Sequence, residues 1–457
     1  MAGQASILER YEAKFPLVVM IRLVLEGLID SEFDRVFEKE RSRQYHREVL
    51  FSDMGKIVSD VVLRLAPSPF HAFNQHKEAL QVSATAFYNK LNRIETLTTE
   101  AIVATCAEKA RNFNWPLNYQ PWQWLKGYRC RVVDGNHLRA SESRIAELRS
   151  HWSSGLPGTT VALLDLQTFL IDRIFLIEDG HAQERTVLGD VINAIQPNDV
   201  IIGDRQYCVT NFLQNIAGQG ACFAIRQHGA LKGELIGKCK KIGRTDTGVV
   251  YEQPMVIGKT SQDSGMKLRR ITVELDEPTE EGETEVHVLS NLPLADVDAI
   301  GIAELYRARW QIEQVFYCIT QTFCCEVKSL GYPKAALFVF SMAIIAYNTW
   351  QVILAALATA HGENISEVIS HKSMSQEIVS HFSGFLFTVP DEIWRAQRPT
   401  SMSQKARWLT KLARQFNLSK HTKRVRGPKL PQPQKSEYKN GAHLSTYKLL
   451  KKRQERC

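Results

Sequence analysis

The chain has 457 residues, which is too long for one compact core, so two to four domains are expected. With 44% hydrophobic and 23% charged residues, the composition is that of a folded globular protein and excludes wholesale disorder. The net charge is +8, and positive charge is concentrated near the C-terminus, because residues 405–457 carry 16 Lys and Arg against only Glu437 and Glu455. This basic segment predicts a polyanionic partner such as nucleic acid, and the alternative is a solvated tail that binds nothing.

Residues 1–122 are predicted to form a helical DNA-binding region. Apolar periodicity over 56–65 indicates one helix, which the Pro67-Ser68-Pro69 break ends. Ser83 is a typical N-cap for a short helix over 83–91, and this helix resembles the second helix of a helix-turn-helix. An ordinary capped surface helix is the alternative, and the local pattern favours it.

The middle of the chain changes to short apolar strands. Three strands joined by turns come first, and two further strands alternate with helices. This order predicts an α/β (α+β) fold with a mixed sheet that has antiparallel and parallel parts. The predicted strands are 128–133, 160–166, 173–178, 199–203 and 222–226, and the predicted helices are 184–195 and 208–217.

The remaining segments alternate between strand and helix patterns. Residues 236–297 are predicted to be a β-rich insertion, and 300–323 a helix. The apolar segment 335–360 is long enough to span a membrane, but a buried core helix is favoured. The predicted domains are 1–122, the helical N-terminal region; 123–235 and 298–362, two parts of one core; 236–297, the insertion; and 363–457, a helical and basic C-terminal region with a Pro-rich linker over 427–440.

The nine cysteines and the N-terminus predict the cellular compartment. The cysteine number is odd, the spacing is scattered, and no pair of Cys-x-x-Cys motifs supports a zinc site. Reduced thiols in the cytoplasm fit this pattern best. The N-terminal residues have no apolar stretch of the kind that marks a signal peptide.

Two aspartates follow predicted strands and are candidates for metal-dependent phosphodiester chemistry. Asp134 ends the first strand and Asp204 ends the fourth, and neighbouring strands would bring their carboxylates together. Mg²⁺ takes hard oxygen ligands, and two such ions about 4 Å apart neutralise phosphate charge and activate a nucleophile. Each aspartate alone is as readily explained as a turn or helix cap. Rival acids are Asp165, Asp190 and Asp199.

A third acid comes from the predicted helix over 300–323. Arg309 and Glu313 follow Tyr306 by three and seven residues, so the three side chains share one helix face. This face presents a carboxylate for a metal ion, a guanidinium for a phosphate and a phenol. Glu304 lies off this face and is the weaker candidate. The alternative is an exposed helix with an ordinary Arg309–Glu313 ion pair.

These motifs together resemble the DDE transposases of the fourth insertion-sequence family. The resemblance covers roughly 125–360 and rests on the strand order, Asp134, the Asp-Arg-Gln-Tyr stretch at 204–207, the β-rich insertion, and Tyr306-x-x-Arg309-x-x-x-Glu313. It implies an RNase H-like catalytic core. It also implies that Asp134, Asp204 and Glu313 hold two Mg²⁺ ions, for which Mn²⁺ can substitute, and that Tyr306 and Arg309 contact DNA phosphates.

The implied activity is cut-and-paste transposition of an insertion sequence. The partners would be double-stranded DNA, as transposon terminal repeats and target DNA, and a second copy of the chain in a homodimer, with no membrane. The location would be cytoplasmic and nucleoid-associated. The alternative is a catalytically weak DNA-binding inhibitor or regulator on the same fold.

Two positions depart from the family pattern. The family signature has a Lys seven residues after the Glu, where this chain has Thr320; Lys328 is the candidate DNA-binding substitute. The insertion contains no Trp on which a flipped base could stack, and it offers Tyr251 instead, so a DNA hairpin intermediate is left open.

Overall fold

In the computed structural model, contacts divide the chain into two units, Met1–His421 and Thr422–Cys457. Within these units the described residues are 6–42, 49–80, 82–114, 117, 124–139, 155–259, 264–279, 281–362 and 365–423. The predicted Pro-rich linker over 427–440 and most of the basic tail lie outside the described residues.

The N-terminal region is helical, as predicted from its periodicity. Ser83 caps the predicted short helix, since its hydroxyl accepts a hydrogen bond from the Ala86 N–H at 3.1 Å. Ser6 and Asp30 cap two further helices in the same way. The helices are α1 (Ile7–Lys14), α2 (Pro16–Leu28), α3 (Ser31–Glu40), α4 (Phe51–Val62), α5 (Pro69–Leu80), α6 (Ala84–Leu91) and α7 (Thr96–Asn114).

A ten-stranded mixed sheet forms the centre of the fold and confirms the predicted α/β class. Its order is β3-β2-β1-β4-β5-β10-β9-β8-β6, and β7 pairs with β8. The meander β1–β3 is antiparallel, whereas β1, β4 and β5 are parallel. The strands are β1 (Arg129–His137), β2 (Thr159–Asp165), β3 (Ile171–Ile177), β4 (Asp199–Gly203), β5 (Cys222–Arg226), β6 (Gly233–Leu235), β7 (Lys240–Thr245), β8 (Gly248–Ile257), β9 (Met266–Leu275) and β10 (Glu285–Ser290).

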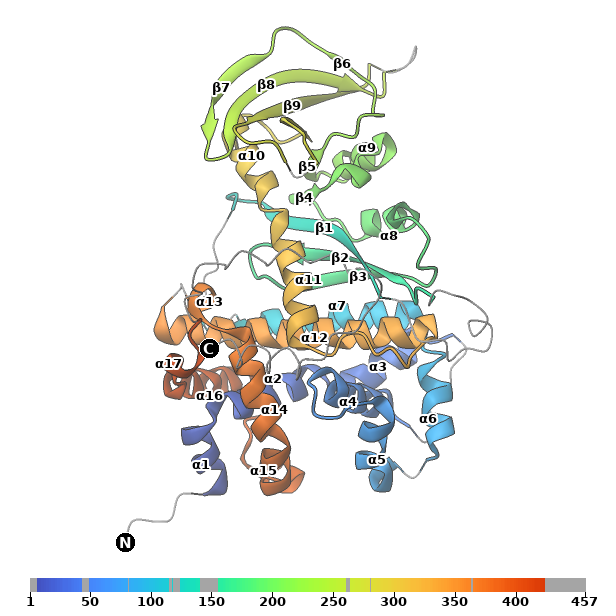
Figure 1. Ribbon diagram of the computed structural model, residues 1–457, viewed down its shortest axis with the longest axis vertical. Helices are drawn as coiled ribbons and strands as arrows, with labels where there is room; N and C mark the ends of the chain where they lie inside the picture. The colour runs from blue at the N-terminus through green and yellow to red at the C-terminus, as the bar shows by residue number, and fades with distance from the viewer. Residues whose placement is uncertain are drawn as a thin grey trace, which may run out of the picture. The chain divides into compact units, whose positions relative to one another are not determined.

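Helices cover both faces of the first five strands. On one face α8 (Leu188–Asn193) and α9 (Thr210–Gly218) enclose a small core with residues such as Val133, Ile201 and Phe212. On the other face α7 lies beside α12 (Pro333–His361) and contacts β3 (Figure 1). Of the most apolar part of α12, 94% is buried, so the prediction of a core helix is confirmed, although its length and composition would also suit a membrane span.

Strands from the predicted insertion continue the same sheet, because β10 pairs with β5 and β9 pairs with β10. The chain then returns through α10 (Ala299–Arg307) and α11 (Trp310–Thr322), which run from the insertion strands toward α12 in Figure 1. The remaining helices pack on α12, on α2 or on one another. They are α13 (Ile365–Val368), α14 (His371–Thr388), α15 (Asp391–Gln397), α16 (Met402–Gln415) and α17 (Leu418–His421).

A buried ion network joins the starts of β1 and β4 to β3. The Arg131 guanidinium, whose side chain is 1% exposed, donates to Asp172 at 2.6 Å and to Asp199 at 3.2 Å. Arg129 binds Asp199 through two nitrogens, and Arg111 binds Asp172 at 2.6 Å. The network lies at the starts of these strands, whereas the predicted site lies at their far ends.

Candidate active site

Asp134 and Asp204 lie on neighbouring parallel strands, as predicted. The β1–β4 register sets Val133 opposite Gly203. Asp134 follows Val133 in the chain and Asp204 follows Gly203, so the two aspartates come at the same level of the sheet. Asp134 accepts the Gly135 N–H at 2.9 Å, and its side chain is 18% exposed. Asp204 caps a short 3-10 helix, η4 (Arg205–Tyr207), because its carboxylate accepts the Gln206 N–H at 2.8 Å. The cap interpretation of Asp204 therefore holds together with its place beside Asp134.

The predicted continuous helix over 300–323 is wrong in one respect. The helix is interrupted at Ala308 and Arg309, where α10 ends and α11 begins. The predicted ion pair survives the break, since Arg309 Nη2 lies 2.7 Å from Glu313 Oε1. Glu313 stands in the first turn of α11 with a side chain that is 42% exposed. Tyr306 is half-buried beside Arg309, and burial raises the pKa of its phenol.

Arg309 connects the two distant acids of the predicted triad. Its Nη1 lies 3.7 Å from Asp134 Oδ2, while its Nη2 pairs with Glu313. One guanidinium thus faces carboxylates from β1 and α11, so these acids lie no further apart than a single planar fork can span. The packing of α11 against β1 brings them together.

A fourth acid, Glu184, belongs to the same cluster and escaped the sequence reasoning. It is 7% exposed and begins the 3-10 helix η3 (Glu184–Val187). The Tyr207 hydroxyl donates to its Oε2 at 2.7 Å, and His137 Nε2 lies 3.9 Å from its Oε1. A Cβ at Gly135 would lie only 2.0 Å from Glu184 Oε1, so the carboxylate packs directly over the β1 backbone. The sequence carried no signal for it, because an isolated acid before a predicted helix is an ordinary first-turn residue.

The two 3-10 helices η3 and η4 are held together by two contacts. Besides the Tyr207–Glu184 hydrogen bond, Arg185 Nε donates to the Gln206 carbonyl at 2.8 Å. The turn after Asp204 is therefore held against the segment that carries Glu184. This arrangement keeps three carboxylates near one another at the ends of β1 and β4.

Crowded negative charge and burial perturb the protonation of this cluster. Burial raises the pKa of Asp134 to about 7; Arg309 opposes the rise, and Glu184 and Asp204 add to it. Burial also raises the pKa of Glu184, and the charge of Asp204 raises it further, whereas the Tyr207 hydrogen bond lowers it. Desolvation and neighbouring negative charges disfavour the ionised form of a carboxyl group, and a nearby cation stabilises that form.

The structure does not present a preformed site for two ions. Among the described residues, no three His, Cys, Asp or Glu side chains are grouped so that they could hold a metal ion. Arg309 instead supplies the positive charge between Asp134 and Glu313. The donor chemistry does fit Mg²⁺, which takes carboxylate oxygens and keeps several of its waters. The acids are thus suited to hard cations, but Arg309 has to move before an ion can lie between Asp134 and Glu313.

The other predicted residues separate into two groups. Lys328 and Thr320 line a cavity at the far end of α11. The rivals of the triad are placed elsewhere: Asp165 and Asp199 contact the Arg side chains of the buried network, and Asp190 is exposed on α8.

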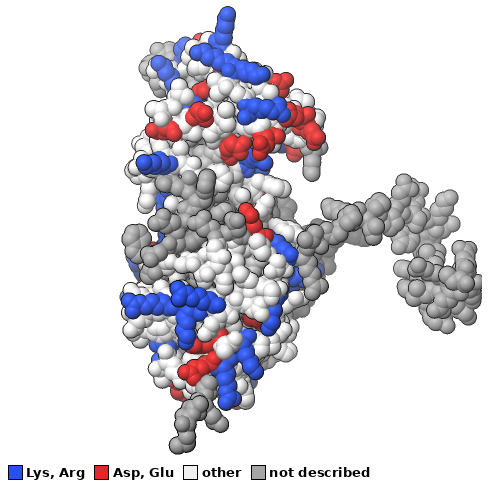
Figure 2. Space-filling view, turned by 90° about the vertical axis from the view of Figure 1, so that its left-hand side faces the viewer, with Lys and Arg blue, Asp and Glu red and all other residues white. Residues whose placement is uncertain are grey.

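Charge on the surface is mixed on the face that Figure 2 shows. Lys and Arg side chains stand among Asp and Glu side chains over both the insertion strands and the helical layer. Surface charge on this face therefore does not by itself locate a path for nucleic acid. The grouped acids and Arg309 remain the more specific feature.

Comparison with known proteins supplies a family for this region. Residues 125–349 match the transposase DDE domain, a range that contains Asp134, Glu184, Asp204, Arg309 and Glu313. A solved structure described as a piggyBac transposase synaptic complex with hairpin DNA aligns over 86% of this chain and 84% of that chain, with 12% sequence identity and a TM-score of 0.42. No curated protein matches the chain.

Proposed function

We infer that this chain, whose residues 125–349 are a transposase DDE domain, is a transposase in which Asp134, Asp204 and Glu313 form the catalytic centre that cuts and joins DNA. The observation that carries the assignment of residues is the Arg309 guanidinium, which faces both Asp134 and Glu313 and so joins acids from opposite ends of the domain. The narrower membership in the fourth insertion-sequence family stays a prediction.

Divalent cations, Mg²⁺ or Mn²⁺, are the proposed cofactors of this centre. When bound there, they would neutralise charge on the phosphate and lower the pKa of a water or a 3′-hydroxyl. The chain's own residues prepare for that charge: Asp134 and Asp204 project from adjacent rigid strands, and Glu313 projects from α11. We place Glu184 in the centre as a fourth carboxylate, because it packs on Gly135 beside Asp134.

Arg309 has two partners available in this proposal. Without DNA it is half-buried between carboxylates, as the ion pairs with Asp134 and Glu313 show. A DNA phosphate is negatively charged like a carboxylate, and it can accept two hydrogen bonds from the planar Arg309 guanidinium. We propose that Arg309 turns from the acids to the phosphate when DNA binds, with Tyr306 beside it. Glu313 and Asp134 are then free to bind cations.

The reaction we propose is cut-and-paste transposition of an insertion sequence. The freed 3′-hydroxyl at each terminal repeat attacks target DNA, and a homodimer holds the paired ends. The cytoplasm, at the nucleoid, is the proposed location. The competing proposal is a DNA-binding inhibitor or regulator that retains the fold without useful catalysis, and the experiment below separates the two.

The test is Mg²⁺-dependent cleavage of a duplex that carries the ends of the element encoding the chain. Asp134→Asn, Asp204→Asn and Glu313→Gln preserve size and remove charge, so each should bind DNA as the wild type does and lose cleavage by at least about a hundredfold. Asp190→Asn, an exposed acid on α8, is the matched control and should cleave normally.

Three results would change the assignment. Normal cleavage by any one triad variant removes that residue from the centre. No cleavage by the wild type, combined with tight DNA binding, favours the regulator. Equal cleavage with Mg²⁺ and with a chelator removes the cation from the reaction.

A further inference from the structure

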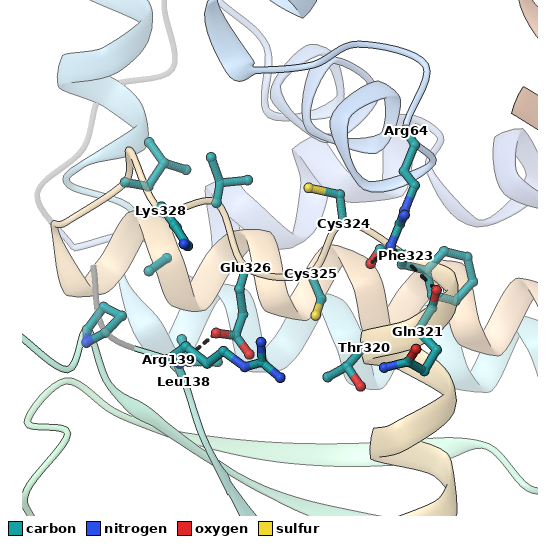
Figure 3. A pocket seen from close by; sticks show the side chains of 14 residues that line it. Arg64, Leu138, Arg139, Thr320, Gln321, Phe323, Cys324, Cys325, Glu326 and Lys328 are labelled. Carbon is teal, nitrogen blue, oxygen red and sulfur yellow. Dashed lines mark hydrogen bonds between the residues drawn. The ribbon is translucent and has the colours of Figure 1, made fainter. Parts of the chain in front are cut away.

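A cavity of about 240 Å³ lies at the far ends of the two elements that carry Asp134 and Glu313. Beyond Asp134, β1 runs into Leu138 and Arg139, and α11 runs from Glu313 to Thr320 and Gln321; both ends line the cavity. A water needs roughly 15 Å³ on this measure, so the cavity has room for a much larger group. Figure 3 shows Arg139, Glu326 and Lys328 on one side of it and Arg64, Gln321 and Thr320 on the other.

Two cations line this cavity without forming an ion pair with a described residue. The side chains of Arg139 and Lys328 are exposed, and among the described residues neither makes an ion pair or a side-chain hydrogen bond. Glu326 is the acid of the lining, and its carboxylate accepts the backbone N–H of Arg139 at 2.6 Å. Burial raises the pKa of Glu326, whereas this bond and the charge of the Arg139 side chain both lower it. The lining therefore carries more positive than negative charge.

Arg64 offsets the negative end of α11. Its Nη2 donates to the carbonyls of Gln321 at 3.4 Å and Phe323 at 3.3 Å, which belong to the last turn of α11 and the residue after it. Those carbonyls would otherwise repel an anion. Arg64 has a φ of 63°, at a position after α4 where glycine is usual and where a side chain costs roughly 1 kcal/mol. An Arg at a strained glycine position indicates that its side chain is needed there.

The remaining lining is neutral or favours an anion. Ala336 lies in the first turn of α12, and a helix N-terminus carries partial positive charge. Cys324 and Cys325 also line the cavity, and burial raises the pKa of both thiols, that of Cys325 to about 12. The thiols are therefore protonated at neutral pH and add no negative charge.

Resting on the function proposed above, we propose that this cavity binds a phosphate group of the DNA backbone, with Arg139 and Lys328 as its ligands and Arg64 as the residue that makes the end of α11 compatible with an anion. The cavity stands seven residues beyond Glu313 on a helix and five beyond Asp134 on a strand, or roughly 10 to 17 Å. At 3.4 Å per base pair, the bound phosphate lies roughly three to five base pairs from the scissile bond.

The experiment measures binding of the full chain to a labelled duplex in a chelator, by fluorescence anisotropy from low to moderate salt. Each phosphate contact contributes a slope of about 0.9 to the dependence of log affinity on log salt. Because the two cations share one phosphate in this proposal, Arg139→Gln with Lys328→Gln should lower that slope by about 1 and weaken binding by roughly tenfold. Arg395→Gln is the matched control, because Arg395 is 64% exposed on α15 and pairs with Asp391 at 3.0 Å.

A second measurement locates the bound phosphate. Uncharged methylphosphonate linkages are placed one at a time along the duplex. One position, three to five base pairs from the cleavage point, should weaken wild-type binding and leave the double variant unaffected. Two outcomes overturn the proposal. One is a double variant that binds like Arg395→Gln. The other is a duplex in which no single linkage weakens binding of the wild type more than binding of the double variant.

Failure of this proposal and failure of the proposed function give different results. If the wild type cleaves DNA but the double variant binds normally, only the phosphate site falls. If the double variant binds weakly but the wild type never cleaves, the cavity still contacts DNA and the catalytic assignment falls.

Discussion

Replacement of Arg131 by methionine tests whether the buried ion network supports the strands of the catalytic centre. The Arg131 side chain is 1% exposed, and its partners Asp172 and Asp199 are each 2% exposed. The substitution removes hydrogen bonds of 2.6 and 3.2 Å to these carboxylates and one of 3.0 Å to the Ala194 carbonyl. Asp172 keeps Arg111, and Asp199 keeps two bonds from Arg129.

The magnitude follows from these remaining partners. Removal of one partner from a buried ion pair costs about 3 to 5 kcal/mol, because an uncompensated charge stays in a desolvated place. Since Arg111 and Arg129 still face the two acids, the lower end applies, and we expect a loss of about 3 kcal/mol in the free energy of unfolding. Arg131→Met also leaves an excess negative charge. A further Asp172→Asn change restores the balance, so the double variant should be less destabilised than the two single losses added together.

The assay is urea unfolding at neutral pH, followed by tryptophan fluorescence. Lys259→Gln is the control, because Lys259 and Glu234 form an exposed pair at 2.9 Å with both side chains 60% exposed, and such a pair contributes less than about 1 kcal/mol. A loss for Arg131→Met no larger than that of the control would refute the reasoning. Strict additivity of Arg131→Met and Asp172→Asn would refute the coupling within the network.

Two further predictions concern α7 and β1. Burial raises the pKa of Glu100 on α7 to about 7, so the folded state prefers the protonated form, and its stability falls as pH rises from about 4.5 to 7. Glu100→Gln keeps an acceptor for the Leu176 N–H, so it should raise the free energy of unfolding at pH 8 by up to about 3 kcal/mol and leave it unchanged at pH 4. Glu108→Gln, exposed on the same helix, should change neither value, and equal effects of Glu100→Gln at both pH values would contradict the shift. Gly135→Ala places a Cβ against Glu184 Oε1, so the carboxylate must leave the Tyr207 hydroxyl, and the free energy of unfolding should fall by about 1 to 3 kcal/mol. Glu184→Ala in the same chain should remove most of this loss, and additive effects of the two substitutions in the same unfolding assay would show that the contact does not matter.

Much of the fold could be predicted because local patterns report local geometry. Short apolar runs ending in Asp134 and Asp204 indicated strands, and their order indicated a mixed sheet in which both acids could lie side by side. The β1–β4 register confirms that neighbourhood. The apolar segment over 335–360 indicated a helix without a polar face, and α12 is buried as such a helix must be.

Other features could not be predicted, since no local pattern encodes them. The interruption at Ala308 and Arg309 lies inside a stretch whose composition suits a continuous helix. Glu184 joins the acidic cluster only because η3 packs on β1 and η4. The strands of the insertion extend the central sheet through β10, which the alternation within each strand does not reveal.

The sequence by itself therefore determined the class of the fold, the strand ends that carry Asp134 and Asp204, and the spacing that pairs Arg309 with Glu313. Only the tertiary structure decided which distant charges meet: Arg309 with Asp134, Glu184 with Tyr207, and Arg131 with Asp172 and Asp199. The physical reason is that side-chain periodicity fixes the face on which a residue lies, whereas its partners across the core depend on how separate elements pack.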